Sequence, residues 1–532
     1  MGMMPVALVL LGRLMMHLPN RRRFLADVGR SMLVASVGSS LAFDLRLASA
    51  ADAEGTERLT FRTREPLVDL LQSSAPDEML RLVVKELQRG LALKDLTAAA
   101  ALANARAFAG EDYVGFHTLM ALRPALAMAE ELSGPAAALP VLKVLYRNSN
   151  RIAEAGVATA DALRPVQGSA SDARGAQGIR EAVHRREQSE AERALAASTL
   201  VSAEAGFNDL LPTVEEGPEV HRVVLAARAW DMISLVGEEN AATMLRQSLR
   251  YCLKSEERAA VHFVNVRTML PRVMDQFRLE TTAWGTKPVD DAWVVEMVKT
   301  LWSSSPDQAA EAVAAAIVEG ISPPRIFEAI SLATNELVLR DGGRKKEWAQ
   351  PGKPEGSVHG DSIGVHASDA AHAWRTIAMA SNARQRNAAI VLSAWQAAQD
   401  RSQRKEEFEK WEPRPLQQHL ERVKPADQAG LLGMLHEAIQ ANDQELACAV
   451  ALRYGSTGHT EGPAIELLRG YAVSQDGALH AEKYYHTVCS NFRVTSPAMR
   501  WKHLVALARV TASEYGRPAA GIERAKELVG VS

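Results

Sequence analysis

The segment "VHGDSIGVHASDAAHAWR" gathers residue types that bind metal ions. His366, Asp369 and His372 follow one another at intervals of three residues, so each neighbouring pair lies on one face of a helix. A metal ion could take Asp369 and one of these histidines, because His366 and His372 are roughly 9 Å apart along a helix axis. If the helix begins at Ser368 as N-cap, His366 lies in the preceding loop and Asp369 could orient an imidazole instead. Helix capping with polar packing between helices is the alternative interpretation.

Three further histidines lie early in apolar segments with helical spacing. His117 lies in "YVGFHTLMALRPALAM", His221 in "PEVHRVVLAARAW" and His262 in "AAVHFVNVRTMLPRV". Each of them, taken singly, is typical of a histidine packed in a core. Several inward histidines on different helices could instead build a metal or cofactor site, because helical bundles make such sites from facing helices.

The C-terminal segment "GALHAEKYYHTVCSNF" adds polar residues at helical spacing. Glu482 and His486 are four residues apart and could form a carboxylate–imidazole pair. His486 and Cys489 are three apart, which would allow a nucleophilic thiol, although no third orienting group is apparent.

The sequence thus provides candidate metal ligands but no assignable catalytic or cofactor-binding residue. The candidate ligands are His117, His221, His366, Asp369, His372 and His480. A transition metal is the cofactor class that these residue types favour.

Several common chemistries have no motif in the chain. It contains no G-x-G-x-x-G after a strand, no G-x-x-x-x-G-K-[ST], no C-x-x-C-H and no G-x-S-x-G. These absences argue against a nucleotide cofactor and covalent haem. A net charge of −3 gives no global basicity for nucleic-acid binding, and three cysteines are too few for a disulfide framework.

The elements that would position these residues are helices. Ala, Leu, Glu, Arg and Gln dominate, and apolar residues recur every three or four positions, which predicts an all-α protein. Leu59–Val68 is the only plausible extended piece, with Pro66 ending it. Successive helix–turn–helix units predict a helical-hairpin repeat array of the α-solenoid or α/α-toroid kind. The predicted units are 75–108, 113–154, 219–253, 290–319, 323–340, 366–399, 426–453 and 462–515.

Two long breaks divide the predicted array. Residues 156–178 are rich in Gly, Ala, Ser and Asp and indicate a linker or a long surface loop. Residues 341–364 form a basic loop that leads into the histidine-rich segment, which favours a lid over a pocket, with a solvated insertion as the alternative. The remaining regions are 51–155 (N-terminal helices), 179–340 (central repeats) and 365–532 (C-terminal repeats).

Residues 1–50 have the parts of a twin-arginine export signal. Arg21 and Arg22 begin an R-R-x-F-L core, a modestly apolar run follows, and Ala48-Ser49-Ala50 is a cleavage site of the A-x-A type. The apolar run is too short to span a bilayer. We therefore expect the twin-arginine machinery as a partner, cleavage after Ala50, and a periplasmic or extracellular protein without a stable membrane span. Because this route carries folded proteins, it raises the expectation of a cofactor inserted before export.

Three segments carry a resemblance to known proteins. "GVHASDAAHAWRTIA", "FHTLMALRPALAM" and "HAEKYYHTVCSNFRVTSPAMRW" resemble segments of a group of twin-arginine-exported all-helical bacterial proteins. That group is distantly similar to the questin-oxidase-like family, some of whose members are implicated in oxidative ring cleavage. The resemblance implies a redox enzyme and points to His117, His221, His366, His372 and His480. The long basic insertion before His366 departs from the family pattern.

Two functions are therefore expected from the sequence. The first is an exported helical protein with a histidine-lined pocket, acting as a metal-dependent oxidoreductase. The second is a non-catalytic helical scaffold that binds a protein or a cell-envelope component. Histidines more than about 10 Å apart would favour the scaffold, whereas convergence at metal-ligand spacing would favour the enzyme.

Overall fold

Helices make up the regular structure of the part of the chain that is described. The structure, a computed structural model, describes residues 58–158, 161–424 and 427–531. In these residues no β-strand is present, and the only β-type pairings are isolated bridges such as Lys287 with Ile321. The all-α prediction is confirmed. The export signal predicted over residues 1–50 lies outside the described residues.

The first half of the chain supplies eleven of the α-helices in the described residues. They are α3 (Glu65–Ser73), α4 (Pro76–Gln88), α5 (Leu93–Phe108), α6 (Tyr113–Glu130), α7 (Leu139–Ala155), α8 (Gly175–His184), α9 (Gln188–Val201), α10 (Ala203–Glu215), α11 (Val220–Val236), α12 (Ala241–His262) and α13 (Val264–Gln276).

The second half supplies thirteen more within the described residues. They are α14 (Asp291–Ser303), α15 (Pro306–Val318), α16 (Pro323–Arg340), α17 (Ile363–Ala380), α18 (Ala383–Ser402), α19 (Lys405–Phe408), α20 (Gln417–Leu420), α21 (Gln428–Gln440), α22 (Gln444–Ser456), α23 (Glu461–Ser474), α24 (Ala481–Val494), α25 (Trp501–Glu514) and α26 (Ile522–Val529).

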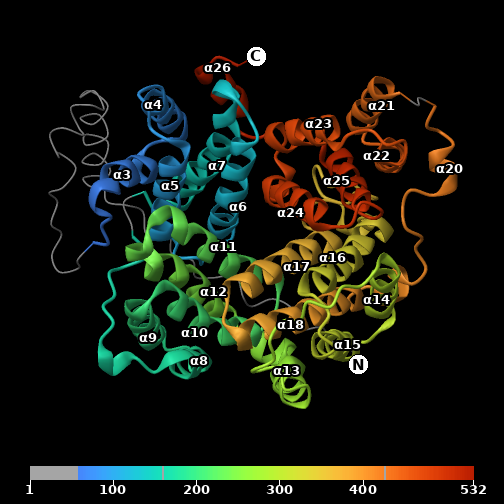
Figure 1. The fold of residues 1–532 in the computed structure, drawn as a ribbon. Coiled ribbons are helices and arrows are strands. Elements are labelled where there is room, and N and C mark those ends of the chain that lie inside the picture. Colours follow the sequence, from blue (N-terminus) through green and yellow to red (C-terminus); the bar gives the residue numbers. More distant parts are fainter. Residues whose placement is uncertain (1–57, 159–160, 425–426, 532) are drawn as a thin grey trace, which may run out of the picture. The chain divides into compact units, whose positions relative to one another are not determined.

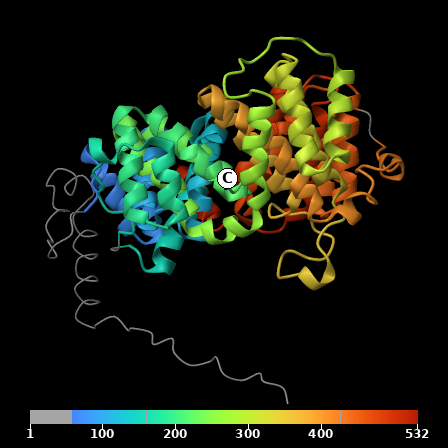
Figure 2. The same ribbon diagram turned by 90° about the horizontal axis from the view of Figure 1, so that it is seen from below.

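The two halves share one core. The described residues form a single compact unit, and one continuous apolar cluster runs from Phe61 to Ala525. In Figures 1 and 2 the blue-to-green helices α3–α12 lie beside the yellow-to-red helices α14–α25, while α13 contacts α15 and α18, and α26 packs on α7 and α4. At their boundary α11 packs on α17 and α6 packs on α24, while α6 also contacts α11 and α17 contacts α24. These four helices surround the site described below.

Helix ends follow the local sequence signals in several places. Ser305 and Gln308 form a capping box at the start of α15, with Pro306 in its first turn. The predicted extended piece at Leu59–Val68 is wrong: Arg62–Arg64 form a 3-10 turn and α3 begins at Glu65. Pro66 suits the first turn of a helix, where no N–H is required, so it begins α3 here rather than ending a strand.

The start of α17 decides where His366 lies. Ser362, not Ser368, caps the helix, and its hydroxyl accepts from the Val365 N–H. His366 is therefore part of the first turns of the helix. Gly364 lets this turn approach α16 closely, because a Cβ at this position would lie 2.5 Å from the Val338 backbone nitrogen.

Both predicted breaks are held by specific polar contacts. In the first, the Ala162 and Leu163 N–H groups donate to the Arg106 carbonyl, and α8 already begins at Gly175. The second break includes the gold segment that projects in Figure 2. Within it, Asp361 is ion-paired with both Arg344 and Lys353. No helix in the described residues has the length and apolar character needed to cross a membrane.

Candidate metal centre

Four histidines from four helices form a closed ring of neighbouring imidazoles. The ring centroids of His117 and His221 are 4.9 Å apart, and those of His221 and His366 are 5.5 Å apart. His366 and His480 follow at 4.9 Å, and His480 returns to His117 at 5.2 Å. We call these four residues the histidine ring. Sequence separation between its members exceeds 100 residues, so only the folded chain brings them together.

Each member of the ring lies at the N-terminal end of a helix. His117, His221 and His366 lie within the first five residues of α6, α11 and α17, and His480 is the N-cap residue of α24. Four positive helix ends therefore converge on the ring. This arrangement disfavours extra protons on the imidazoles.

Hydrogen bonds fix the tautomer of three members. Nδ1 of His117 lies 2.7 Å from the Tyr113 carbonyl oxygen, and Nδ1 of His480 lies 2.7 Å from the Ala478 carbonyl oxygen. Nδ1 of His221 lies 3.2 Å from Oε2 of Glu219. These oxygens only accept, so each Nδ1 carries the proton and each Nε2 keeps a lone pair. Histidines that bind metals have the same arrangement.

The Nε2 atoms of the ring have few partners within the protein. Nε2 of His117 and Nε2 of His221 are buried and make no hydrogen bond to any described residue. Nε2 of His366 lies 3.0 Å from Nε2 of His480. Because Nε2 of His480 holds a lone pair, His366 donates in this contact. Unpartnered buried acceptors are costly, and a metal ion would satisfy them.

The ring spacing fits shared coordination, although the side chains are not yet in coordinating positions. With nitrogen–metal bonds of roughly 2.0–2.1 Å, the centroids of two imidazoles on one tetrahedral ion lie about 5 Å apart. As they stand, however, no group of three or more His, Cys, Asp or Glu side chains in the described part of the chain is arranged to hold a metal ion. Small rotations of the rings would be needed to direct the Nε2 atoms at one point.

The surroundings favour the neutral form of three members of the ring, His117, His366 and His480. Burial, followed by the charge of Lys483, holds the pKa of His117 and that of His480 well below the usual value. Burial and the neighbouring His221 lower the pKa of His366 to about 3. Neutral imidazole is the form that binds a metal. The side chain of His221 is 16% exposed, so the ring is not sealed from solvent.

Glu219 supports the ring from one side. Besides the contact with His221, it caps α11 by accepting from the Arg222 N–H, and it accepts the Tyr251 hydroxyl at 2.7 Å. Burial raises the pKa of Glu219, but the hydrogen bonds from His221 and Tyr251 outweigh it and lower the pKa to about 2. Sequence reasoning missed this carboxylate. Its position two residues before His221, at a helix cap, was the available signal.

Two of the six candidate ligands lie outside the ring. Asp369 is one turn beyond His366 and accepts from the Thr487 hydroxyl at 2.8 Å, where both side chains are buried. His372 is a further turn away, with its imidazole 5.4 Å from that of His486, and its Nδ1 accepts from Arg375 at 3.3 Å. The structure therefore brings four of the six candidates together and leaves Asp369 and His372 beside them.

The remaining sequence candidates have other surroundings. His262, which was expected to point inward, is exposed at the end of α12. Glu482 lies 2.8 Å from the ammonium of Lys143 instead of pairing with His486. Burial raises the pKa of the Cys489 thiol to about 12, which opposes its use as a nucleophile.

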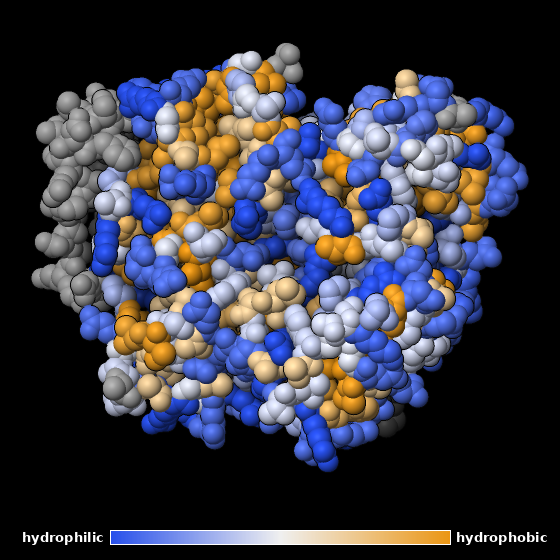
Figure 3. Space-filling view, in the orientation of Figure 1, coloured by the Kyte–Doolittle hydropathy of each residue, from blue (hydrophilic) through white to orange (hydrophobic). Residues whose placement is uncertain are grey.

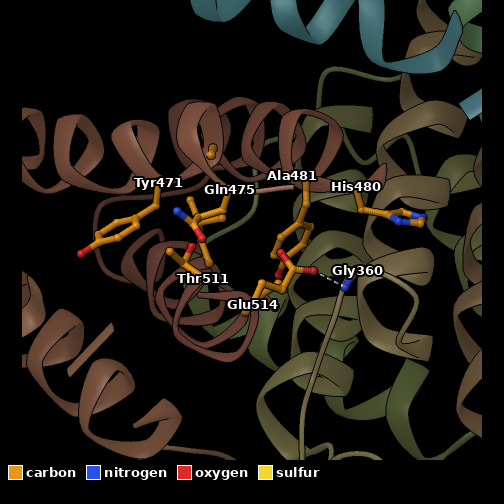
Figure 4. A pocket seen from close by; sticks show the side chains of 11 residues that line it. Gly360, Tyr471, Gln475, His480, Ala481, Thr511 and Glu514 are labelled. Atoms are coloured by element: carbon orange, nitrogen blue, oxygen red, sulfur yellow. Dashed lines mark hydrogen bonds between the residues drawn. The ribbon is translucent and has the colours of Figure 1, made fainter. Parts of the chain in front are cut away.

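A water-sized cavity lies beside the ring (Figure 4). It measures about 20 Å³ and is lined by His480, Tyr484, Gly360 and Glu514 among others, which is room for one water molecule. The Gly360 N–H donates to Glu514 at 2.7 Å, and the Ser513 hydroxyl accepts from the Val358 N–H. The basic loop is thus held on α25 immediately behind His480.

The lowered pKa values of His117, His366 and His480 predict a loss of stability in acid. The folded-state pKa of each affected histidine lies below its unfolded value of about 6.5, so the unfolded chain takes up more protons as the pH falls. Each such histidine contributes about 1.4 kcal/mol per pH unit between roughly pH 6.5 and its folded pKa. Glu514 and Asp400, whose pKa values burial raises to about 7 and about 8, act in the opposite direction. Histidines with a lowered pKa outnumber them.

Denaturant unfolding at pH 7 and pH 5 would test this expectation. The parent should lose several kcal/mol of unfolding free energy between these values, and His366→Gln should lose about 2 kcal/mol less. His262→Gln, at an exposed position, should behave as the parent does. Equal losses for the parent and His366→Gln would contradict the prediction.

Comparison of the chain with protein-family models, with curated proteins and with solved structures gave no match.

Proposed function

We propose that the histidine ring binds one transition-metal ion and that the chain is an exported, metal-dependent oxidoreductase. The observation that carries the proposal is the ring itself: four imidazoles, three with Nδ1 donating to an oxygen, at centroid distances of 4.9 to 5.5 Å. Imidazole ligands suit iron, copper, zinc and nickel. A metal ion so held supplies redox or Lewis-acid chemistry to a bound substrate.

The residues of the chain would divide the work of holding such an ion. His117 and His480 are oriented by backbone carbonyls of their own segments, which do not titrate. His221 donates to the anionic Glu219, which makes this imidazole a stronger ligand. His366 would contribute the fourth nitrogen from α17 once the proton that it donates to His480 is moved from its Nε2. The partly exposed side of His221 gives a substrate its approach.

Two features favour an oxidoreductase over a hydrolase within this proposal. One is the resemblance to the questin-oxidase-like proteins, which implies oxidative chemistry. The other is the twin-arginine signal, because a cytoplasmic metal-loading step is a common reason for folding before export. The periplasmic or extracellular location belongs to the same proposal. We also propose that the paired helices form a helical-hairpin repeat array around the ring.

The scaffold alternative would have been favoured by scattered histidines. The sequence resemblance pointed to five histidines. In four of them the imidazole centroid instead lies within 5.5 Å of the centroids of two others. A purely structural role leaves the unpartnered Nε2 atoms of His117 and His221 without an explanation. For these reasons the metal centre is the function we propose.

Metal analysis of natively exported protein tests the proposal. We expect about one equivalent of a single transition metal per chain by inductively coupled plasma mass spectrometry, lost on dialysis against a strong chelator and restored by the same ion. Oxygen consumption with candidate aromatic substrates then separates a redox ion from a hydrolytic one. A folded parent that neither contains nor takes up any transition metal would refute the metal centre.

A further inference from the structure

The segment immediately before His480 has a strained backbone. Gly477, Ala478 and Leu479 have positive φ angles of 59°, 47° and 73°, so the turn that they form between α23 and α24 is left-handed. Glycine adopts this conformation freely, but in Ala478 and Leu479 the Cβ crowds the following carbonyl oxygen. Two such residues in succession, directly before a member of the histidine ring, must be held by their surroundings.

The left-handed turn determines how His480 is presented to the ring. It directs the carbonyl oxygen of Ala478 toward the side chain two residues later, where it accepts the Nδ1–H of His480 at 2.7 Å. The Gly477 carbonyl accepts the His480 backbone N–H, also at 2.7 Å. A right-handed backbone at Ala478 would point its carbonyl in another direction. The strained turn therefore fixes the tautomer that leaves the Nε2 lone pair of His480 facing the ring.

A buried lysine ties the two ends of this turn together. The ammonium of Lys143, on α7, donates to the carbonyl oxygens of Ala472 and Gln475 at 2.8 and 2.5 Å, at the end of α23. It also lies 2.8 Å from Oε1 of Glu482, in the first turn of α24. The side chains of Lys143 and Glu482 are 1% and 0% exposed, so this contact is sealed in the interior. We call Lys143 and its three partners the lysine clamp.

Further contacts hold the turn from other sides. Arg147 donates to the Asp476 carbonyl at 3.3 Å, and the Asp476 N–H donates to the Arg517 carbonyl at 2.8 Å. Gly360 packs directly on His480, since a Cβ at this glycine would lie 2.3 Å from the Cβ of the histidine. Strained backbone persists in a folded protein where the surroundings determine it in several ways, as they do here.

We propose that the left-handed turn Gly477–Leu479 is a strained device that presents His480 for metal binding, and that Lys143 and Glu482 are positioning residues that maintain it. Both act through the turn rather than on the ion. The proposal rests on the metal centre proposed above and adds residues that determine its affinity. Without the lysine clamp the turn relaxes, so the presentation of His480 changes even where the protein stays folded.

Co²⁺ titration of the chelator-treated full chain tests the proposal, with the visible absorption of bound Co²⁺ as readout. Figure 3 shows a hydrophilic hollow where α6, α11, α17 and α24 meet in Figure 1, which gives an added ion a polar approach to the helices of the ring. The double variant Lys143→Met with Glu482→Leu removes both charges of the buried pair and should remain folded. We expect it to bind Co²⁺ about tenfold or more weakly than the parent does.

Adding Ala478→Gly to the double variant separates the turn from the general stability of the protein. Because glycine adopts the left-handed conformation without strain, the turn no longer depends on the lysine clamp, and most of the lost Co²⁺ affinity should return. Ala109→Gly in the same background is the matched control. Ala109 is also a left-handed alanine, with a φ of 53°, but it follows the end of α5 and is not part of the turn. It should restore none of the affinity.

NMR of the metal-free chain with labelled histidines gives a readout that does not depend on the metal. Nδ1 of His480 should carry the proton in the parent, both tautomers should be populated in the double variant, and Ala478→Gly should return the parental one. The signal is assigned with His480→Gln. Thermal unfolding shows whether each variant is folded, and Ala478→Val, which raises the cost of the left-handed backbone, replaces the double variant if that is not.

The two readouts distinguish failure of this proposal from failure of the metal centre. A parent that binds no Co²⁺ would refute the metal centre, and the tautomers of His480 would then decide the role of the turn by themselves. Parental affinity and a parental tautomer in the double variant would overturn the proposal. Equal recovery of affinity with Ala478→Gly and Ala109→Gly would overturn it as well.

Discussion

Replacing His366 with alanine is expected to reduce bound transition metal from about one equivalent per chain to less than a tenth of that. Its Nε2 lies 3.0 Å from Nε2 of His480, and its imidazole is a neighbour of His221 as well. Removing this member opens the ring between α11 and α24. Loss of one such ligand costs the metal site one of its four nitrogen donors, and the neighbours cannot replace it because three of them are fixed through Nδ1.

His372→Ala provides the control on the same helix. His372 is more deeply buried than His366 and also contacts a second histidine, but that partner is His486, outside the ring. Metal content measured by mass spectrometry should therefore stay near the parental value in His372→Ala. Equal metal loss in both variants, with both folded by circular dichroism, would mean that the site is not the ring.

Replacing Glu482 with glutamine is expected to destabilise the protein by about 3–5 kcal/mol. The carboxylate is fully buried and lies 2.8 Å from the ammonium of Lys143, whose side chain is 1% exposed. Burial raises the pKa of Glu482, but Lys143 and Arg147 lower it to about 2, so the group is an anion at neutral pH. Its loss leaves Lys143 charged in the interior, with only the Ala472 and Gln475 carbonyls as partners.

Denaturant unfolding of three variants would measure this effect. Replacing both partners, as Lys143→Met with Glu482→Leu, should recover much of the loss because the buried ammonium is removed with its carboxylate and Arg147 keeps Asp476 as a partner. Glu523→Gln removes a carboxylate from an exposed pair with Lys526 and should change the unfolding free energy by less than about 1 kcal/mol. A cost for Glu482→Gln no larger than that of Glu523→Gln would contradict the expectation.

The sequence was informative where local chemistry decides the structure. Helical spacing predicted the all-α class, and the start of α15 coincides with a local capping signal, Ser305 with Gln308. Where two local signals competed, the outcome depended on tertiary packing. Ser362 and Ser368 are both plausible caps, and α17 begins at the first because Gly364 permits close contact with α16.

The grouping of the histidines could be inferred only in part. Apolar neighbours in the sequence predict that His117 and His221 point inward. The same pattern predicts this for His262, yet His262 is exposed. His366 and His372 share a helix and similar neighbours, yet they belong to different clusters, because α24 presents His480 at one level and His486 two turns later. Such register between helices distant in sequence is a property of the packed chain.

The distribution of the ring along the chain has a consequence for the timing of its assembly. During synthesis the histidine of α6 leaves the ribosome hundreds of residues before that of α24. The ring therefore closes only after residue 480 has emerged, when the helices of the first half have had time to fold. Any ion that needs all four imidazoles would enter after that point, and a chain terminated before residue 480 would lack the fourth member.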